Sequence, residues 1–221
     1  MSDKKRAWVI GATGFWGRNV VLSLLRSNWR VTAFSRSKPE DLLAWAEASN
    51  QELDWVPLDL DNLDLEQLPP PPEALFNCAS VFDEDLERML CVNTLAPIAL
   101  IEHVLPKMVS AAYGRLAVFV GQNARIGLPG LGGFSATQAG LWTWAEAQAR
   151  ALKGSGVTLT LVFPPRAPSK LQRNLAEQLG TAPKLSKRAN ADALVASVLH
   201  GCKRAGRRPW LAAVNGLCWI A

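Results

Sequence analysis

Apolar and polar positions alternate along the chain in blocks that predict strands and helices in turn. Short apolar runs predict buried strands, and apolar residues at every third or fourth position predict helices. The predicted strands span residues 7–10, 29–35, 53–58, 75–80 (with its exit turn), 115–120 and 157–163, with 210–214 as a candidate last strand. The predicted helices span residues 15–26, 39–48, 83–108 with a break near 93–97, 134–153, 171–179 and 191–200. This alternation predicts an α/β fold, with one doubly wound parallel sheet and helices on both faces.

Three glycines, Gly11, Gly14 and Gly17, join the first predicted strand to the first predicted helix. Glycines at such a turn let backbone N–H groups approach a pyrophosphate at the positive end of the helix. The arrangement therefore predicts a Rossmann-type dinucleotide site. The alternative is a glycine-rich turn that serves only close packing. Trp16 lies in this turn, where its ring could shield a ligand or take the place of the pyrophosphate.

The end of the second predicted strand carries basic residues and no acidic ones. Residues 31–38 contain Arg36 and Lys38 but neither Asp nor Glu. In this fold an acidic residue here binds the ribose hydroxyl of NAD, whereas an arginine accommodates the 2′-phosphate of NADP. The pattern favours NADP(H), and the alternative is an ordinary surface arginine after a strand.

Composition limits the functional classes. The chain has 221 residues, of which 49% are hydrophobic and 19% charged, and its net charge is +5. These values indicate a globular protein. We see no basic stripe with interleaved aromatic residues, so we expect no nucleic-acid partner. The basic residues at 4–6 and 204–208 are expected to be solvated ends, and the apolar stretch 211–221 to be a last strand or a subunit contact.

The cysteines show no spacing typical of a metal site. They are Cys78, Cys91, Cys202 and Cys218. Without a signal peptide they are expected to be reduced thiols, so we expect a cytoplasmic protein without a bound metal. No apolar run looks long enough to cross a membrane, so no membrane association is expected.

Several landmarks in order along the chain resemble the short-chain dehydrogenase/reductase family. They are the glycine turn at 11–17, Asp59-Leu60 as the pair that contacts adenine, the turn at 77–80, Asn93 within 92–94, the helix segment 105–108 and the strand at 114–120. The resemblance covers nearly the whole chain, so residues 1–221 are expected to form one NADP(H)-binding domain. The resemblance assigns cofactor contacts to Gly11, Thr13, Gly14, Phe15, Trp16, Gly17, Ser35, Arg36, Asp59, Leu60, Asn77, Cys78, Ala79, Pro164 and Ser169.

The family's catalytic positions are changed in this chain. Phe134 stands where the family has its catalytic tyrosine, and Gln138 stands where it has its lysine. The serine position falls on Gly121, or on Gln122 with a one-residue slip, and only Asn93 is retained. In the family the tyrosine supplies a proton to the carbonyl oxygen and the lysine lowers its pKa. Loss of a positioned acid typically lowers a rate by about 10²–10⁴-fold.

No other residue clearly replaces that acid. Tyr113 precedes the fifth predicted strand and should lie at the far end of the sheet, while His103 and His200 fall on predicted helices. The acidic group at 83–85 could act in acid–base chemistry or could simply form the first turn of a helix. At the nicotinamide end, Pro165 replaces a family glycine and stiffens the turn.

Three functional hypotheses remain open. The first is an NADP(H)-binding protein that senses the cofactor or binds a protein partner. The second is an enzyme with rearranged chemistry: a divergent oxidoreductase, or a dehydratase, isomerase or cyclase acting on a small carbonyl or acyl substrate. The third is a scaffold that binds no cofactor. In each case the family resemblance implies a homodimer or homotetramer. The stretch 141–149 offers side chains suited to the subunit contact, and a buried core face explains part of it equally well.

Overall fold

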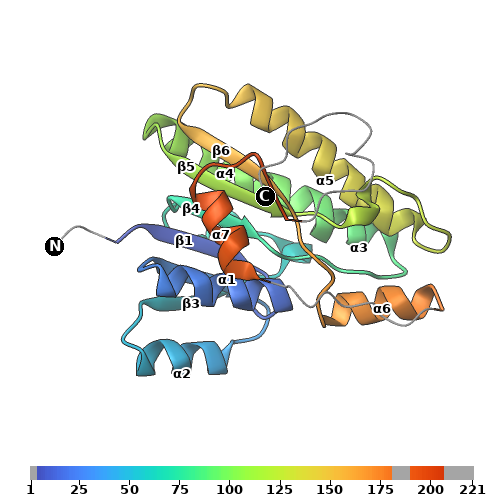
Figure 1. Cartoon of the computed structure of the whole chain (residues 1–221), viewed down its shortest axis with the longest axis horizontal. Helices are drawn as coiled ribbons and strands as arrows, with labels where there is room; N and C mark the ends of the chain where they lie inside the picture. The colour runs from blue at the N-terminus through green and yellow to red at the C-terminus, as the bar shows by residue number, and fades with distance from the viewer. Residues whose placement is uncertain (1–3, 181–189, 207–221) are drawn as a thin grey trace.

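Seven parallel strands form one sheet in a computed structural model of the chain, which describes residues 4–180 and 190–206 (Figure 1). The strand order is β3-β2-β1-β4-β5-β6-β7. The strands are β1 (Arg6–Ile10), β2 (Arg30–Ser35), β3 (Leu53–Pro57), β4 (Ala74–Asn77), β5 (Gly114–Phe119), β6 (Val157–Phe163) and β7 (Arg204–Gly206). The chain winds outward from β1 to β3 and then returns to place β4 on the other side of β1. This order confirms the predicted doubly wound sheet.

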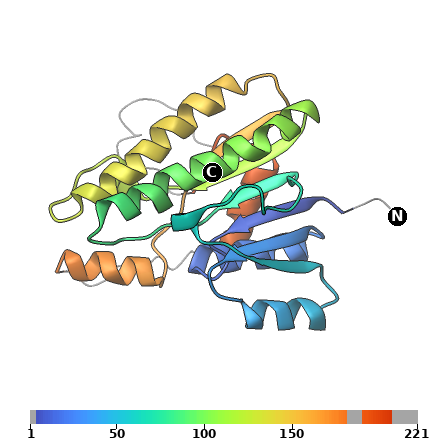
Figure 2. The same ribbon diagram turned by 180° about the vertical axis from the view of Figure 1, so that it is seen from behind.

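Helices cover both faces of the sheet, as Figures 1 and 2 show from opposite sides. The helices are α1 (Phe15–Arg26), α2 (Glu40–Ala48), α3 (Leu86–Leu90), α4 (Ala96–Ser110), α5 (Gly132–Ala151), α6 (Lys170–Gln178) and α7 (Ala191–Leu199). One hydrophobic core packs α1, α2 and α7 against one face of the sheet, and a second packs α4 and α5 against the other. Alternate residues of β1 supply the two cores, with Val9 on one face and Trp8 on the other.

The predicted elements are confirmed at nearly every position. The break expected near 93–97 is a π-helical turn, Cys91–Leu95, between α3 and α4. The crossover from β3 to β4 contains the proline run 69–72 and only one short 3-10 helix, Leu60–Asn62. The candidate strand at 210–214 and the stretch 211–221 lie outside the described residues.

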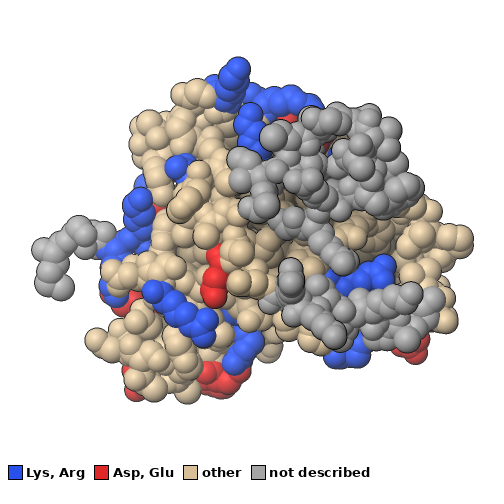
Figure 3. Space-filling model, in the orientation of Figure 1, with Lys and Arg blue, Asp and Glu red and all other residues tan. Residues whose placement is uncertain are grey.

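Both basic segments expected to be solvated ends include residues of the sheet, and residues 207–208 lie outside the described residues. Arg6 begins β1, and its guanidinium pairs with Glu73 at 3.1 Å. Arg204 begins β7 and pairs with Leu161 of β6 in the sheet register. Both segments are therefore held by pairing with a neighbouring strand. Figure 3 shows Lys and Arg side chains spread over the surface on the face seen in Figure 1.

The expectation that no segment is long and apolar enough to cross a membrane was also wrong. The continuous helical run Leu86–Ser110 meets that criterion by length and composition. Half of its most apolar window is buried inside the fold, where Leu100, Ile101 and Val104 pack on the sheet. A core helix needs the same apolar composition as a membrane span, and sequence alone does not separate the two.

Part of the stretch 141–149 of α5 faces the core of the protein. Leu141, Trp142 and Ala145 are buried in the core beneath α5, and Trp142 stacks edge-on with Phe163 of β6. Packing within the fold therefore accounts for these three residues, whereas Trp144 is only half-buried.

Candidate functional site

The predicted site segments follow the carboxyl ends of four neighbouring strands. The glycine turn follows β1, residues 78–80 follow β4, Gly121 closely follows β5, and Pro164 follows β6. Parallel neighbours end at the same edge of the sheet, so these segments converge there. The strand order reverses between β1 and β4, and this switch point is where open α/β sheets bind ligands.

Close packing requires glycine at two positions of the turn. Gly11 has a φ of 77°, and a Cβ on it would lie 2.9 Å from Cα of Ala79. A Cβ on Gly17 would lie 2.1 Å from the carbonyl oxygen of Gly11. Both contacts are closer than real carbon atoms allow, so α1 can approach β1 this closely only with glycine at 11 and 17.

The N-terminus of α1 has the features of an anion site. Gly14 caps the helix without a side-chain hydrogen bond, and the first turn contains no acidic residue. Among the described residues, no backbone carbonyl or side chain accepts from the N–H groups of Phe15 or Trp16. The first N–H groups of a helix need an acceptor and carry partial positive charge. A dinucleotide pyrophosphate therefore fits this turn, and Thr13, which is exposed beside it, is placed to contact it.

The adenosine side is built from the ends of β2 and β3. Ser35 donates to the carbonyl of Ser37 at 2.7 Å and accepts from Nε1 of Trp55 at 3.1 Å, which holds the turn after β2. Arg36 is exposed in this turn, whereas Lys38 pairs with Glu40 at 3.3 Å. Arg36 is therefore the cation best placed for a ribose phosphate.

Asp59 and Leu60 lie after β3 with different roles. Asp59 caps the short 3-10 helix by accepting from the N–H of Asp61 at 3.2 Å. Leu60 is buried in the core below α4. Leu60 thus anchors the loop after β3 in the core, and Asp59 is the polar residue at its start. The resemblance implies that this pair contacts adenine.

The turn after β4 carries a buried amide without a partner. Asn77 is fully buried, and neither its Nδ2 nor its Oδ1 has a hydrogen-bond partner among the described residues. It pairs with Ile10 in the sheet register, directly before the glycine turn. The next residue, Cys78, donates its N–H to the carbonyl of Ile10, and burial raises the pKa of its thiol. The orphaned amide lies beside the glycine turn but is not among the residues that line the cavity described below.

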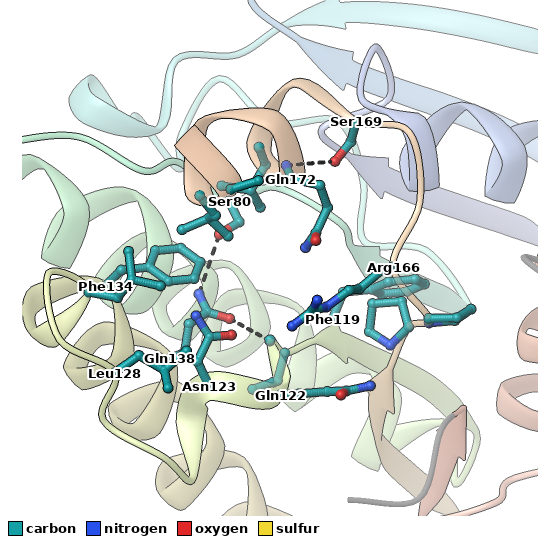
Figure 4. Close-up of a pocket in the computed structure, with 18 of the residues that line it drawn as sticks. Ser80, Phe119, Gln122, Asn123, Leu128, Phe134, Gln138, Arg166, Ser169 and Gln172 are labelled. Carbon is teal, nitrogen blue, oxygen red and sulfur yellow. Dashed lines mark hydrogen bonds between the residues drawn. The ribbon is translucent and has the colours of Figure 1, made fainter. Parts of the chain in front are cut away.

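Gln138 takes the place expected for a catalytic lysine and is hydrogen-bonded on both sides. Its Oε1 accepts from the backbone N–H of Gly121 at 2.8 Å, and its Nε2 donates to Oγ of Ser80 at 3.3 Å (Figure 4). The side chain is 2% exposed. A neutral amide therefore links β4, β5 and α5 where a cation would otherwise be buried.

Asn93 continues this network into the π-helical turn. Its Oδ1 accepts from the N–H of Val81 at 2.7 Å, and its Nδ2 donates to the carbonyl of the same residue at 2.8 Å. Nδ2 also donates to Oγ1 of Thr137, which in turn donates to the carbonyl of Phe134 at 2.8 Å. The retained asparagine thus holds the loop after β4 against α5 and has a structural role in this chain.

Phe134 lies at the wall of a cavity of about 350 Å³. Its ring is 2% exposed and meets Phe82 edge-on, with centroids 5.9 Å apart. The rest of this wall is apolar and comes from α5, α6 and the loop before α5: Leu128, Leu131, Leu171, Leu175 and Leu179. The opposite end, toward the glycine turn, is lined by Trp16, Cys78, Phe119 and Pro164.

The cavity lining carries polar groups but no ordinary acid or base. Its described lining contains no Asp, Glu, His, Lys or Tyr. Tyr113 accepts from Lys5 at the far end of the sheet, as predicted, and neither His103 nor His200 is among the lining residues. Within residues 4–180 and 190–206, no three His, Cys, Asp or Glu side chains gather as a metal site. The described cysteines, Cys78, Cys91 and Cys202, are free thiols, and Cys218 lies outside the described residues.

The acidic group after β4 stabilises the local structure and does not line the cavity. Asp85 caps α3 by accepting from the N–H groups of Glu87 and Arg88. Asp83 accepts from the N–H of Asp85 and pairs with Arg88, and these contacts lower the pKa of its carboxyl group. These partners support the structural interpretation of the group.

The segment after β6 differs from the expected cofactor loop. Pro165 is buried where the family has glycine, and Oγ of Ser169 accepts from the N–H of Gln172 at 3.1 Å as the cap of α6. The Ser169 hydroxyl proton remains available to a ligand. The cavity also uses Ser80, Arg166 and Gln172, to which the sequence assigned no role. Arg166 and Gln172 reach the cavity only because α6 folds over the edge of the sheet.

Two protein-family models match the part of the chain that forms this site. The family model for short chain dehydrogenases matches residues 73–180, and the model for the NAD dependent epimerase/dehydratase family matches residues 7–115. Each match covers just under half of the chain, and together they span the described site from the glycine turn to α6. An uncharacterized oxidoreductase from Myxococcus xanthus is 28% identical over 189 residues, which cover 76% of this chain and 74% of the relative.

The chain is thus similar to short chain dehydrogenases over residues 73–180 and to the NAD dependent epimerase/dehydratase family over residues 7–115. Solved structures show the same fold. A crystal structure of an actinorhodin polyketide ketoreductase with NADPH has a TM-score of 0.81 at 17% identity, over 93% of this chain and 95% of that one. A short-chain dehydrogenase from Sphingobium yanoikuyae in complex with NADPH has a TM-score of 0.78 at 20% identity, over 96% of this chain and 92% of that one.

Proposed function

We propose that this chain is an NADP(H)-binding member of the short-chain dehydrogenase/reductase family that does not act as an ordinary carbonyl reductase. It would serve as a cofactor-sensing or partner-binding subunit, with residues 1–221 as one cytoplasmic domain. The observation that carries the proposal is the contrast within one site. The N–H groups of Phe15 and Trp16 at the start of α1 have no acceptor among the described residues and would suit a pyrophosphate, whereas Gln138 closes the catalytic end with a neutral hydrogen-bonded amide.

The residues that would hold the cofactor come from both sides of the switch point. The N-terminus of α1 would bind the pyrophosphate, Arg36 the ribose phosphate, and Asp59 and Leu60 would flank the adenine. Asn77, Pro164 and Ser169 would contact the nicotinamide end. When bound, NADPH would supply a hydride, but Phe134 offers no proton to a carbonyl oxygen and Gln138 offers no positive charge.

A second function keeps specific support. An enzyme with rearranged chemistry needs a pocket beside Phe134, and the cavity lies there. Ser80, Gln122 and Gln138 would orient a small carbonyl or acyl group by hydrogen bonds. An enzyme of this kind is expected to turn over a substrate that needs no strong acid from the protein. The proposed cofactor-free scaffold predicts no dinucleotide binding at all.

Calorimetric titration of the purified chain with NADPH and NADH tests the proposal. We expect NADPH to bind more tightly than NADH, and Arg36→Ala to reduce that difference by about tenfold, as for loss of one charge-assisted contact. Lys153→Ala is the control, because this exposed lysine precedes β6 and so lies at the opposite end of that strand from Pro164.

Activity assays separate the first two functions. NADPH oxidation with a simple ketone or an acyl thioester should stay at the background rate. Turnover at ordinary enzyme rates would overturn the proposal in favour of the second function. Failure to bind either nucleotide would overturn both functions that need a cofactor.

A further inference from the structure

The charged side chains in the described lining of the cavity are all positive. The described lining contains two arginines, Arg125 and Arg166, and no carboxylate. Arg125 is held over the ring of Trp142, with its guanidinium 3.8 Å from the ring centroid. Arg166 is exposed on the segment between β6 and α6, and its side chain extends into the cavity (Figure 4). A bound group near Arg166 therefore meets a positive charge that no acidic lining residue offsets.

Amide side chains surround the same part of the cavity. Gln122 and Asn123 lie on the 3-10 helix after β5, and Gln172 points in from α6 (Figure 4). Nε2 of Gln122 is buried and has no hydrogen-bond partner among the described residues. A buried amide donor without an acceptor is costly unless a ligand or water satisfies it. Amide side chains thus line the cavity from more than one element.

The far wall has the opposite character. Phe134, Leu131 and Leu175 are each less than 10% exposed and belong to one apolar cluster. The described side chains of this cluster are all apolar and cannot satisfy a hydroxyl or a charge. A ligand that fills the cavity must therefore present an apolar body to α5 and α6 and an acceptor-rich group to Arg166.

We propose that the cavity binds an amphipathic carboxylate, with its carboxylate on Arg166 and its aliphatic or aromatic body against Phe134 and the α6 wall. A carboxylate matches the planar guanidinium in a bidentate pair, and such charge-assisted bonds are among the strongest in proteins. A volume of about 350 Å³ lies at the small end of ligand pockets, so the ligand is a small molecule. The inference rests on the proposed function only in placing this ligand beside the dinucleotide.

The test is calorimetry with four probes: octanoate, octanamide, octylammonium and acetate. We expect octanoate to bind at least tenfold more tightly than octanamide and octylammonium, which share its body but not its charge. Acetate, which has the charge but no body, should bind at least tenfold more weakly than octanoate. Equal affinities across the probes would overturn the proposal.

Arg166→Gln and Arg173→Gln form a matched pair of variants. Both arginines are exposed, but Arg173 lies on α6 outside the cavity lining. Arg166→Gln should weaken octanoate to the affinity of octanamide, and Arg173→Gln should leave it unchanged, with unaltered thermal unfolding in both. If Arg166→Gln weakens NADPH and leaves octanoate unchanged, the arginine serves the cofactor and the proposal fails.

Titrating octanoate with and without NADPH keeps the two proposals separate. Octanoate binding in a protein that binds no nucleotide would overturn the proposed function and support the carboxylate site. NADPH binding without selective octanoate binding would do the reverse.

Discussion

Gln138 accepts a hydrogen bond from the backbone N–H of Gly121 at 2.8 Å, across the end of β5. The same amide donates to Ser80 after β4. The position expected for a catalytic cation is therefore part of the structural network of the sheet edge. A buried residue that satisfies polar groups after two neighbouring strands is difficult to replace with a charged one.

Replacing Gln138 with lysine should destabilise the protein. The Gln138→Lys variant leaves the Gly121 N–H without its acceptor and buries an ammonium beside it. We expect the free energy of unfolding to fall by about 2–4 kcal/mol. Urea unfolding measures this change, with Thr143→Lys at an exposed position of α5 as the control, expected within about 0.5 kcal/mol of the wild type. A Gln138→Lys variant of unchanged stability would show that the network has little structural weight.

A methyl group at Gly17 should disrupt the glycine turn. Its Cβ would lie 2.1 Å from the carbonyl oxygen of Gly11, so α1 must move away from β1. We expect Gly17→Ala to lose about 1–3 kcal/mol of stability and to bind NADPH at least tenfold more weakly. Gly127→Ala is the control, because a Cβ there has no neighbour within 4 Å. Normal NADPH affinity in Gly17→Ala would argue against pyrophosphate binding at this turn.

Removal of the Asn93 amide should loosen the loop after β4. Asn93→Ala removes the bonds to both backbone groups of Val81 and to Thr137, all at a buried position. We expect a loss of about 2–4 kcal/mol in unfolding free energy. Asn62→Ala, at an exposed position, should lose less than about 0.5 kcal/mol. A double-mutant cycle with Thr137→Val checks the network, since coupling near zero would contradict it.

The Arg6–Glu73 pair should make stability depend on pH at its acid end. Burial alone would raise the pKa of Glu73, but hydrogen bonds and charge from Arg6 outweigh it, so the pKa is lowered on folding. Its contribution is present above the unfolded pKa of about 4.3 and is lost as the pH falls through the lower folded pKa.

Glu73→Gln tests this pair. Both side chains are about one-third exposed, so solvent screening limits the expected loss to about 0.5–1 kcal/mol at pH 7. Unfolding free energies measured in urea at pH 7 and pH 3 should show this difference shrinking at the lower pH. Glu40→Gln, whose partner Lys38 is also exposed, should show almost no difference at either pH. A Glu73→Gln effect that grows toward pH 3 would contradict the assigned pKa direction.

The elements on either side of the glycine turn were predicted well. The strand, the glycine turn and α1 follow one another within 21 residues, and their spacing alone determines how they meet. The substitutions Phe134 and Gln138 were likewise visible, because the surrounding residues keep the family's frame. Asp85 could be recognised as the start of a helix from its local acidic sequence.

Other features depend on contacts between distant residues. The short strand Arg204–Gly206 carries no apolar pattern and exists because β6 offers it backbone hydrogen bonds. The sequence alone leaves Trp142 suited to a subunit contact or to the core, and in the structure its ring packs against Phe163. In both cases the partner lies outside any local window of sequence.

The sequence by itself determined the alternation of strands and helices, the glycine turn and the absence of a hydroxyl at Phe134, because each depends on short-range pattern or side-chain chemistry. Tertiary structure alone decided that Gln138 bridges Gly121 and Ser80 and that Arg166 enters a cavity walled by α5 and α6. The physical reason is that hydrogen bonds and burial depend on which strand ends meet at the edge of the sheet. Which strand ends lie together depends on the packing of the whole chain and cannot be derived from any single segment.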